Sequence, residues 1–96
     1  IAATDIHDMG AVGVIETFSV ATTIVAADAA CKAAEIDLIE IRLGTGLGGK
    51  AFVTLTGELD MVEAAVAGGI SAINSGFLLR SEVIPSPHRD LSKALL

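Results

Sequence analysis

The glycine-rich segment GTGLGGK, residues 44–50, contains the residue pattern most often tied to chemistry. Its glycines fit the GxGxxG pattern of dinucleotide sites, and with Lys50 they fit the GxxxxGK pattern of phosphate-binding loops. Both patterns work by aiming a helix N-terminus at phosphate. The residues after Lys50 alternate as in a strand, and Ala51 stands where a phosphate-binding loop has Ser or Thr to hold magnesium. We therefore interpret the segment as a turn between two strands.

The other reactive side chains do not form a catalytic or metal-binding set. His7 and His88 lie at opposite ends of the chain without a second ligand at a suitable spacing. Cys31 is expected on the buried face of a helix, where a thiol acts as a small hydrophobe. Glu16 and Asp28 are the carboxylates expected to be partly buried, in structural pairs with a base or with backbone N–H groups. We predict no enzyme activity and no cofactor on this chain.

Hydrophobic periodicity predicts six elements in the order βαββαβ. A period of two indicates strands, and apolar residues three and four apart indicate helices. The first helix has its N-cap at Ser19 and an apolar face made of Val20, Ile24, Ala27, Cys31 and Ala34. The predicted strands are 11–17, 37–43, 51–56 and 77–84. The first predicted helix is 20–35, and the second starts at about Gly57 and runs to about Asn74. Gly76 is expected to end the second helix, and Pro85 is expected to stop the last strand.

This order predicts an α+β fold of the ferredoxin-like type. Two helices would cover one face of a four-stranded antiparallel sheet. The glycines and alanines of the second helix remove side-chain bulk, and the glycines do so at a cost in helix propensity, which indicates close packing against the sheet or a neighbour. Fold alone does not specify a function.

Composition narrows the classes of partner. With 96 residues the chain forms one domain, and 52% hydrophobic residues with a mean hydropathy of +0.69 exceed what so small an interior can bury. Part of that apolar surface is therefore expected to contact other subunits. A net charge of −6, scattered basic residues and the lack of Trp and Tyr argue against nucleic acid. Charges interrupt every apolar stretch and no secretory signal is present, so we expect a cytoplasmic protein that does not span a membrane.

Four segments together resemble the shell-protein domain of bacterial microcompartments, over about residues 10 to 90. Residues 11–17 (AVGVIET) resemble its opening strand, residues 26–34 (AADAACKAA) its first helix, and Val83, Ile84 and Pro85 with Pro87 and His88 its closing motif. Gly44, Thr45 and Gly46 stand where family members place a turn at the pore.

The resemblance implies a structural subunit that assembles into hexagonal tiles, as a hexamer of one domain or a trimer of a tandem chain. The extended turn is similar to that of the second domain in tandem shell proteins of the propanediol-utilisation type. On this interpretation residues 1–9 are a linker or leader, 10–90 the shell domain and 91–96 a tail. Some tandem relatives hold an iron–sulfur cluster on a pore cysteine of the first domain. Cys31 does not match that position, so a cluster is left open only for an upstream domain.

The family's functional positions map onto few residues here. Gly44, Thr45 and Gly46 would line the pore, and Lys32 matches the lysine at the edge between tiles. Ser86 departs from the arginine that single-domain tiles commonly have there, and Arg89 is the candidate to replace it in part. The implied partners are further copies of this chain, other shell proteins and encapsulated enzymes.

Two functions of different classes remain. The first is a structural tile in a cytoplasmic microcompartment shell, with a pore for small polar metabolites. The alternative is a ferredoxin-like oligomeric sensor that binds an anionic effector at the turn of residues 44–50, with Lys50 as its best support.

Overall fold

The computed structural model describes residues 10–43 and 50–86, and in that part the regular elements follow one another as predicted. A single-turn 3-10 helix precedes the last strand. The elements are β1 (Gly10–Thr17), α2 (Val20–Ala33), β2 (Asp37–Leu43), β3 (Ala51–Glu58), α3 (Leu59–Ser71), η1 (Ser75–Phe77) and β4 (Leu78–Ser86). The α+β class and the βαββαβ order are confirmed.

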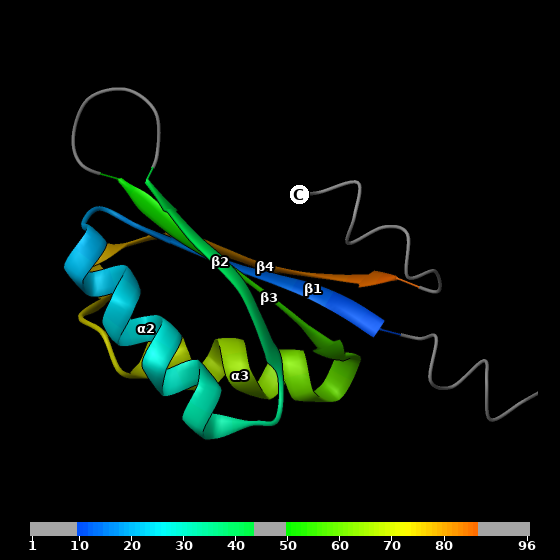
Figure 1. The fold of residues 1–96 in the computed structure, drawn as a ribbon. Coiled ribbons are helices and arrows are strands. Elements are labelled where there is room, and N and C mark those ends of the chain that lie inside the picture. Colours follow the sequence, from blue (N-terminus) through cyan, green and yellow to red (C-terminus); the bar gives the residue numbers. More distant parts are fainter. Residues whose placement is uncertain (1–9, 44–49, 87–96) are drawn as a thin grey trace, which may run out of the picture.

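The strands form one antiparallel sheet of four strands in the order β2-β3-β1-β4, so β2 and β4 are the edges. Both helices lie on the same face of this sheet, and within the described ranges no helix lies over the other face (Figure 1). The core fills the space between the helices and the two central strands. Its main side chains are Ala11, Ile15, Val53 and Leu55 from the sheet and Ala26, Ala30, Val62, Ala65 and Val66 from the helices.

The two helices approach each other closely because small residues meet at their contact. A Cβ on Gly69 would lie 2.8 Å from the Ala26 carbonyl oxygen and 2.9 Å from Cδ1 of Ile15. A Cβ on Gly68 would lie 2.5 Å from that of Ala33. The predicted reason for the glycines of the second helix, close packing, is therefore confirmed.

The helix α2 begins where the sequence indicates. The Oγ of Ser19 accepts a hydrogen bond from the Thr22 N–H at 3.0 Å, which satisfies one of the free N–H groups of the first turn. The helix ends at Ala33, two residues earlier than predicted, and Ala34 is already extended. No helix in the described part is long and apolar enough to cross a membrane.

The end of α3 and the end of β4 differ from the prediction. The helix stops at Ser71, and Gly76 belongs to η1. The strand β4 continues through Pro85, which pairs with Ala11. Proline lacks only one ladder donor, and an edge strand tolerates this loss. The other edge strand, β2, has a register irregularity between Leu38 and Glu40.

Candidate assembly surface

The predicted apolar face of α2 is only partly the face that the structure buries. Thr23, Ala26, Ala27 and Ala30 are buried, whereas Ile24 is 51% exposed. The prediction failed for the further residues Val20 and Cys31, which are also exposed. The cause is the neighbouring helix, because Gly68 and Gly69 allow α3 to contact the Ala26, Ala30 and Ala33 side of α2.

The exposed side of α2 is continuous with the edge of the sheet. Its residues Val20, Ile24 and Cys31 form a stripe on the side of α2 away from α3, and α2 contacts the edge strand β2. In β2, Ile41 and Leu43 pair with Val53 and Ala51, whose side chains are buried under the helices. They therefore project to the helix side of the sheet.

Ile41 and Leu43 remain 38% and 65% exposed at this edge. With the stripe on α2 they form an uncovered apolar surface, which we call the α2–β2 flank: Val20, Ile24, Cys31, Ile41 and Leu43. Apolar side chains gathered in this way are typical of a protein–protein contact. The sequence signalled this surface through its excess of hydrophobic residues.

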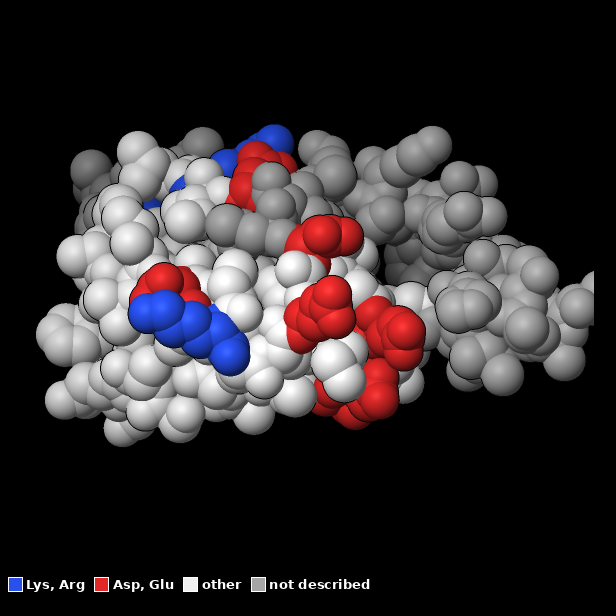
Figure 2. Space-filling view, turned by 60° about the horizontal axis from the view of Figure 1, so that its bottom comes forward, with Lys and Arg blue, Asp and Glu red and all other residues white. Residues whose placement is uncertain are grey.

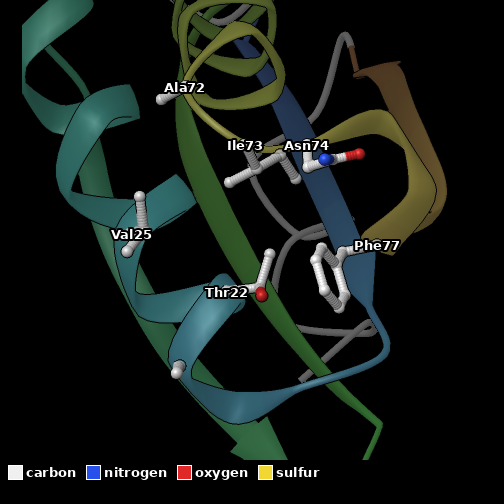
Figure 3. A pocket seen from close by; sticks show the side chains of 7 residues that line it. Thr22, Val25, Ala72, Ile73, Asn74 and Phe77 are labelled. Carbon is white, nitrogen blue, oxygen red and sulfur yellow. The ribbon is translucent and has the colours of Figure 1, made fainter.

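A shallow apolar groove lies on the opposite side of α2 (Figure 3). Thr22 and Val25 contribute from α2, and Ile73, Asn74 and Phe77 contribute from the segment after α3. Val25 and Phe77 are 49% and 48% exposed. This groove and the α2–β2 flank are separate surfaces, because they lie on different sides of the same helix.

Lys32, predicted at the edge between tiles, is in the last turn of α2 and exposed. Its Nζ lies 3.0 Å from Oδ2 of Asp28, four residues earlier. Such an exposed pair contributes about 0.3–0.5 kcal/mol, so a partner's oxygen could replace Asp28 at little cost. Asp28 is exposed, contrary to the prediction of partial burial, but it is paired with a base as expected.

The face of the sheet opposite the helices has charged side chains toward both edge strands, β4 and β2. Arg80 donates to Glu16 at 2.9 Å and also contacts Glu82, and Arg42 donates to Glu40 at 2.8 Å. Glu16 is half-buried and paired, as predicted. The hydrogen bond to Glu16 and the charge of Glu82 raise the pKa of Arg80. A raised pKa keeps this cation charged to a higher pH than usual, and its contribution to stability is lost only as the pH rises through the raised value.

Acidic side chains gather on the helix side of the molecule with no Lys or Arg among them (Figure 2). Glu58, Asp60 and Glu63, all exposed, belong to the start of α3, where carboxylates interact favourably with the helix dipole. In the described residues no three His, Cys, Asp or Glu side chains are grouped so that they could hold a metal ion.

The predicted pore residues Gly44, Thr45 and Gly46 and the predicted edge residue Arg89 lie outside the described residues. So does His88. Lys50, the basis of the anion-binding alternative, is described and exposed. The residues that flank the turn are described: Leu43 ends β2, Ala51 begins β3, and these two residues pair with each other.

The chain matches a family model described as "BMC domain" over residues 11–87. It is 37% identical over 87 residues to the bacterial microcompartment shell protein PduT of Citrobacter freundii, covering 90% of this chain and 47% of that protein. It is 38% identical over 87 residues to the shell protein PduA of Salmonella typhimurium, covering 88% and 89%, and 35% identical over 89 residues to the carboxysome shell protein CcmK2 of Thermosynechococcus vestitus, covering 88% and 84%.

A crystal structure of a microcompartment protein from Desulfitobacterium hafniense has a similar fold, with a TM-score of 0.76 and 55% sequence identity. The match covers 86% of this chain and 47% of that one. This chain therefore spans about half the length of PduT and of the Desulfitobacterium chain, and most of the length of PduA and CcmK2.

Proposed function

This chain belongs to the BMC domain family and is a structural subunit of a bacterial microcompartment shell, and we propose that it forms hexagonal tiles there as one half of a tandem-domain subunit. Shell proteins of this family are structural and they oligomerise, so the family match supports the predicted shell role in the cytoplasm and the predicted lack of enzyme activity. The arrangement of the subunits in the tile is our proposal.

The α2–β2 flank is the observation that supports self-association. It exposes Ile24, Leu43 and their neighbours on a domain with little interior to bury them. In a cyclic tile each copy contacts the next through two different surfaces. The flank would be one of these surfaces, and it adjoins the turn that would line the pore.

The tandem arrangement is supported by length and by the turn. The relatives PduT and the Desulfitobacterium chain are about twice as long as the matched region, and the latter is 55% identical over it. The turn of residues 44–50 is extended, as in a second tandem domain. We propose residues 10–90 as that domain, 1–9 as the linker to an upstream domain and 91–96 as a tail, with three subunits in a tile.

The pore and the tile edge complete the proposal. Gly44, Thr45 and Gly46 would line an opening with backbone groups, which suits small polar metabolites. Lys32 and Arg89 would contact neighbouring tiles, Lys32 by giving its amine to an acceptor across the edge. Other shell proteins and encapsulated enzymes would be the further partners.

Native mass spectrometry of the chain at several concentrations tests the assembly. We expect a trimer or hexamer for the native sequence and a shift to monomer for Ile24→Asp, because a charge in the flank would be buried without a partner. Val25→Asp is the matched control. It changes the next residue of the same helix at nearly equal exposure, 49% against 51%, but it lies outside the flank.

A native chain that stays monomeric at every concentration would contradict self-assembly of this domain. Equal loss of assembly in Ile24→Asp and Val25→Asp would contradict the specific role of the flank.

A further inference from the structure

We propose that Thr17 and Thr23 are positioning residues for the turn of residues 44–50, because they hold the point at which that turn re-enters the sheet. The inference rests on the proposed role of the turn as the margin of a pore. It uses only the described ends of the neighbouring elements: the last residue of β1, the first turn of α2 and the first residue of β3.

Both threonines are buried polar residues with no exposed surface, 0% each. Thr17 Oγ1 and Thr23 Oγ1 lie 2.7 Å apart, and Thr23 Oγ1 donates to the Ala51 carbonyl oxygen at 3.2 Å. Ala51 is itself fully buried, and it pairs with Thr17 on one side and with Leu43 on the other. Three strands and a helix therefore meet at Ala51.

The number of hydroxyl protons determines which group donates and which accepts in this row of hydrogen bonds. Each hydroxyl has a single proton, and Thr17 Oγ1 also accepts from the Ser19 N–H at 3.2 Å. Thr17 Oγ1 has two possible acceptors at 2.7 Å, the Ser19 carbonyl and Thr23 Oγ1. The Ser19 carbonyl already accepts from the Thr23 N–H at 3.1 Å.

If Thr17 donated to Ser19, Thr23 could satisfy either Thr17 or Ala51, but not both. The order Ser19 N–H to Thr17, Thr17 to Thr23 and Thr23 to the Ala51 carbonyl satisfies both hydroxyls and that carbonyl at once, and it leaves the Ser19 carbonyl to the Thr23 N–H. Buried, connected hydrogen bonds of this kind fix relative positions. Through these hydrogen bonds the start of α2 fixes the position of Ala51, where the chain re-enters the sheet after the turn.

The variants Thr23→Val and Thr17→Val remove one hydroxyl each and keep the branched shape. Thr56→Val is the matched control, because Thr56 Oγ1 also donates to a strand carbonyl, that of Ala11 at 3.1 Å, but it lies toward the far end of β3. Thr23→Ser restores the hydroxyl. Hydrogen exchange of the backbone amides is measured on the assembled protein in each case.

We expect amides of residues 50–53 to exchange about tenfold faster in Thr23→Val, because the buried Ala51 carbonyl loses the Thr23 donor, whereas Thr17 can still donate to the Ser19 carbonyl. Amides of residues 83 and 84 should keep their rates, and Thr23→Ser should return residues 50–53 to the native rates. Unchanged exchange at residues 50–53, or an equal acceleration across the sheet, would overturn the proposal.

A second measurement separates this proposal from the pore itself. In a Cys31→Ala background, Thr45→Cys places the single thiol in the turn, and its rate of reaction with a bulky maleimide is compared in tiles and in dispersed chains. If labelling is slower in tiles than in dispersed chains, and Thr23→Val speeds up the labelling in tiles, the result supports both the pore role of the turn and the positioning role of the threonines. Equal labelling in tiles and dispersed chains contradicts the pore role, while the exchange rates still decide whether Thr17 and Thr23 hold the turn.

Discussion

Single residues set how closely the two helices approach. Gly69 faces the Ala26 carbonyl, a backbone atom that cannot rotate away, and Ile15 of the central strand. Alanine would favour the helix by about 1 kcal/mol, but its methyl group would enter space that is already filled. At this position the packing requirement outweighs the helix propensity.

Gly69→Ala is therefore expected to lower the free energy of unfolding by about 1–3 kcal/mol, measured by urea denaturation. The control is Gly76→Ala, whose added Cβ would lie 3.3 Å from Oδ1 of Asn74, a side chain on an exposed turn that can move. A Gly69→Ala variant as stable as the native chain would contradict the close contact between α2 and α3.

Among the elements, the two helices begin differently. Ser19 caps α2 through its side chain, whereas Glu58 at the start of α3 makes no side-chain cap hydrogen bond. Among the first N–H groups of α3, that of Met61 donates to Oδ1 of Asp60 at 3.0 Å, but none is capped by the Glu58 side chain in the way that Ser19 caps α2. The helices should respond in opposite ways to substitution at these positions.

Ser19→Ala should lower the free energy of unfolding by about 1 kcal/mol, and Glu58→Ser should raise it by up to about 1 kcal/mol. Thermal or urea unfolding of both variants measures this difference. If both changes move the stability in the same direction, local capping does not explain the starts of these helices.

The sequence predicted the positions of the helices and strands better than which of their side chains are buried. The strand 37–43 and the cap at Ser19 follow from local patterns, and the structure has both. Local patterns also explain why residues 44–50 join two strands. The buried face of α2 depends on α3, which lies more than twenty residues away in sequence, so Cys31 was placed wrongly. Pro85 stays in β4 because the strand is an edge, which only the sheet order reveals.

The candidate site was predictable to a smaller degree. The hydrophobic excess indicated a contact surface, but its members on α2 and β2 come together only in the folded chain. The link from Thr23 to Ala51 spans 28 residues and has no periodic signature. Thr17 and Thr23 were therefore missed, although hydroxyls at the end of a strand and the start of a helix are a signal worth examining.

For the whole molecule, the position of Lys32 gives a prediction about growth of the shell. Its pair with Asp28 is exposed, so the amine can move to an acceptor on a neighbouring tile. Lys32→Ala should leave the trimer or hexamer intact, change the stability of the domain by less than about 1 kcal/mol and reduce the growth of tiles into sheets. Native mass spectrometry measures the oligomer, and electron microscopy measures the growth of tiles into sheets.

Lys50→Ala is the control, because it removes another exposed positive charge, just before β3 and outside the proposed tile edge. If both variants lose sheets to the same extent, net charge and not the tile edge controls the growth. If Lys32→Ala forms sheets as well as the native chain, Lys32 is not an edge residue.

The two edges of the sheet also bear on how copies of this domain can associate through their backbones. Pro85 interrupts the donors of β4, and the register irregularity distorts β2 near Leu38. An added strand needs a regular row of free N–H and C=O groups, and neither edge offers one along its full length. The sheet edges are thus poor templates for open-ended fibrils, and in the proposed tile the contacts between copies are left to side chains.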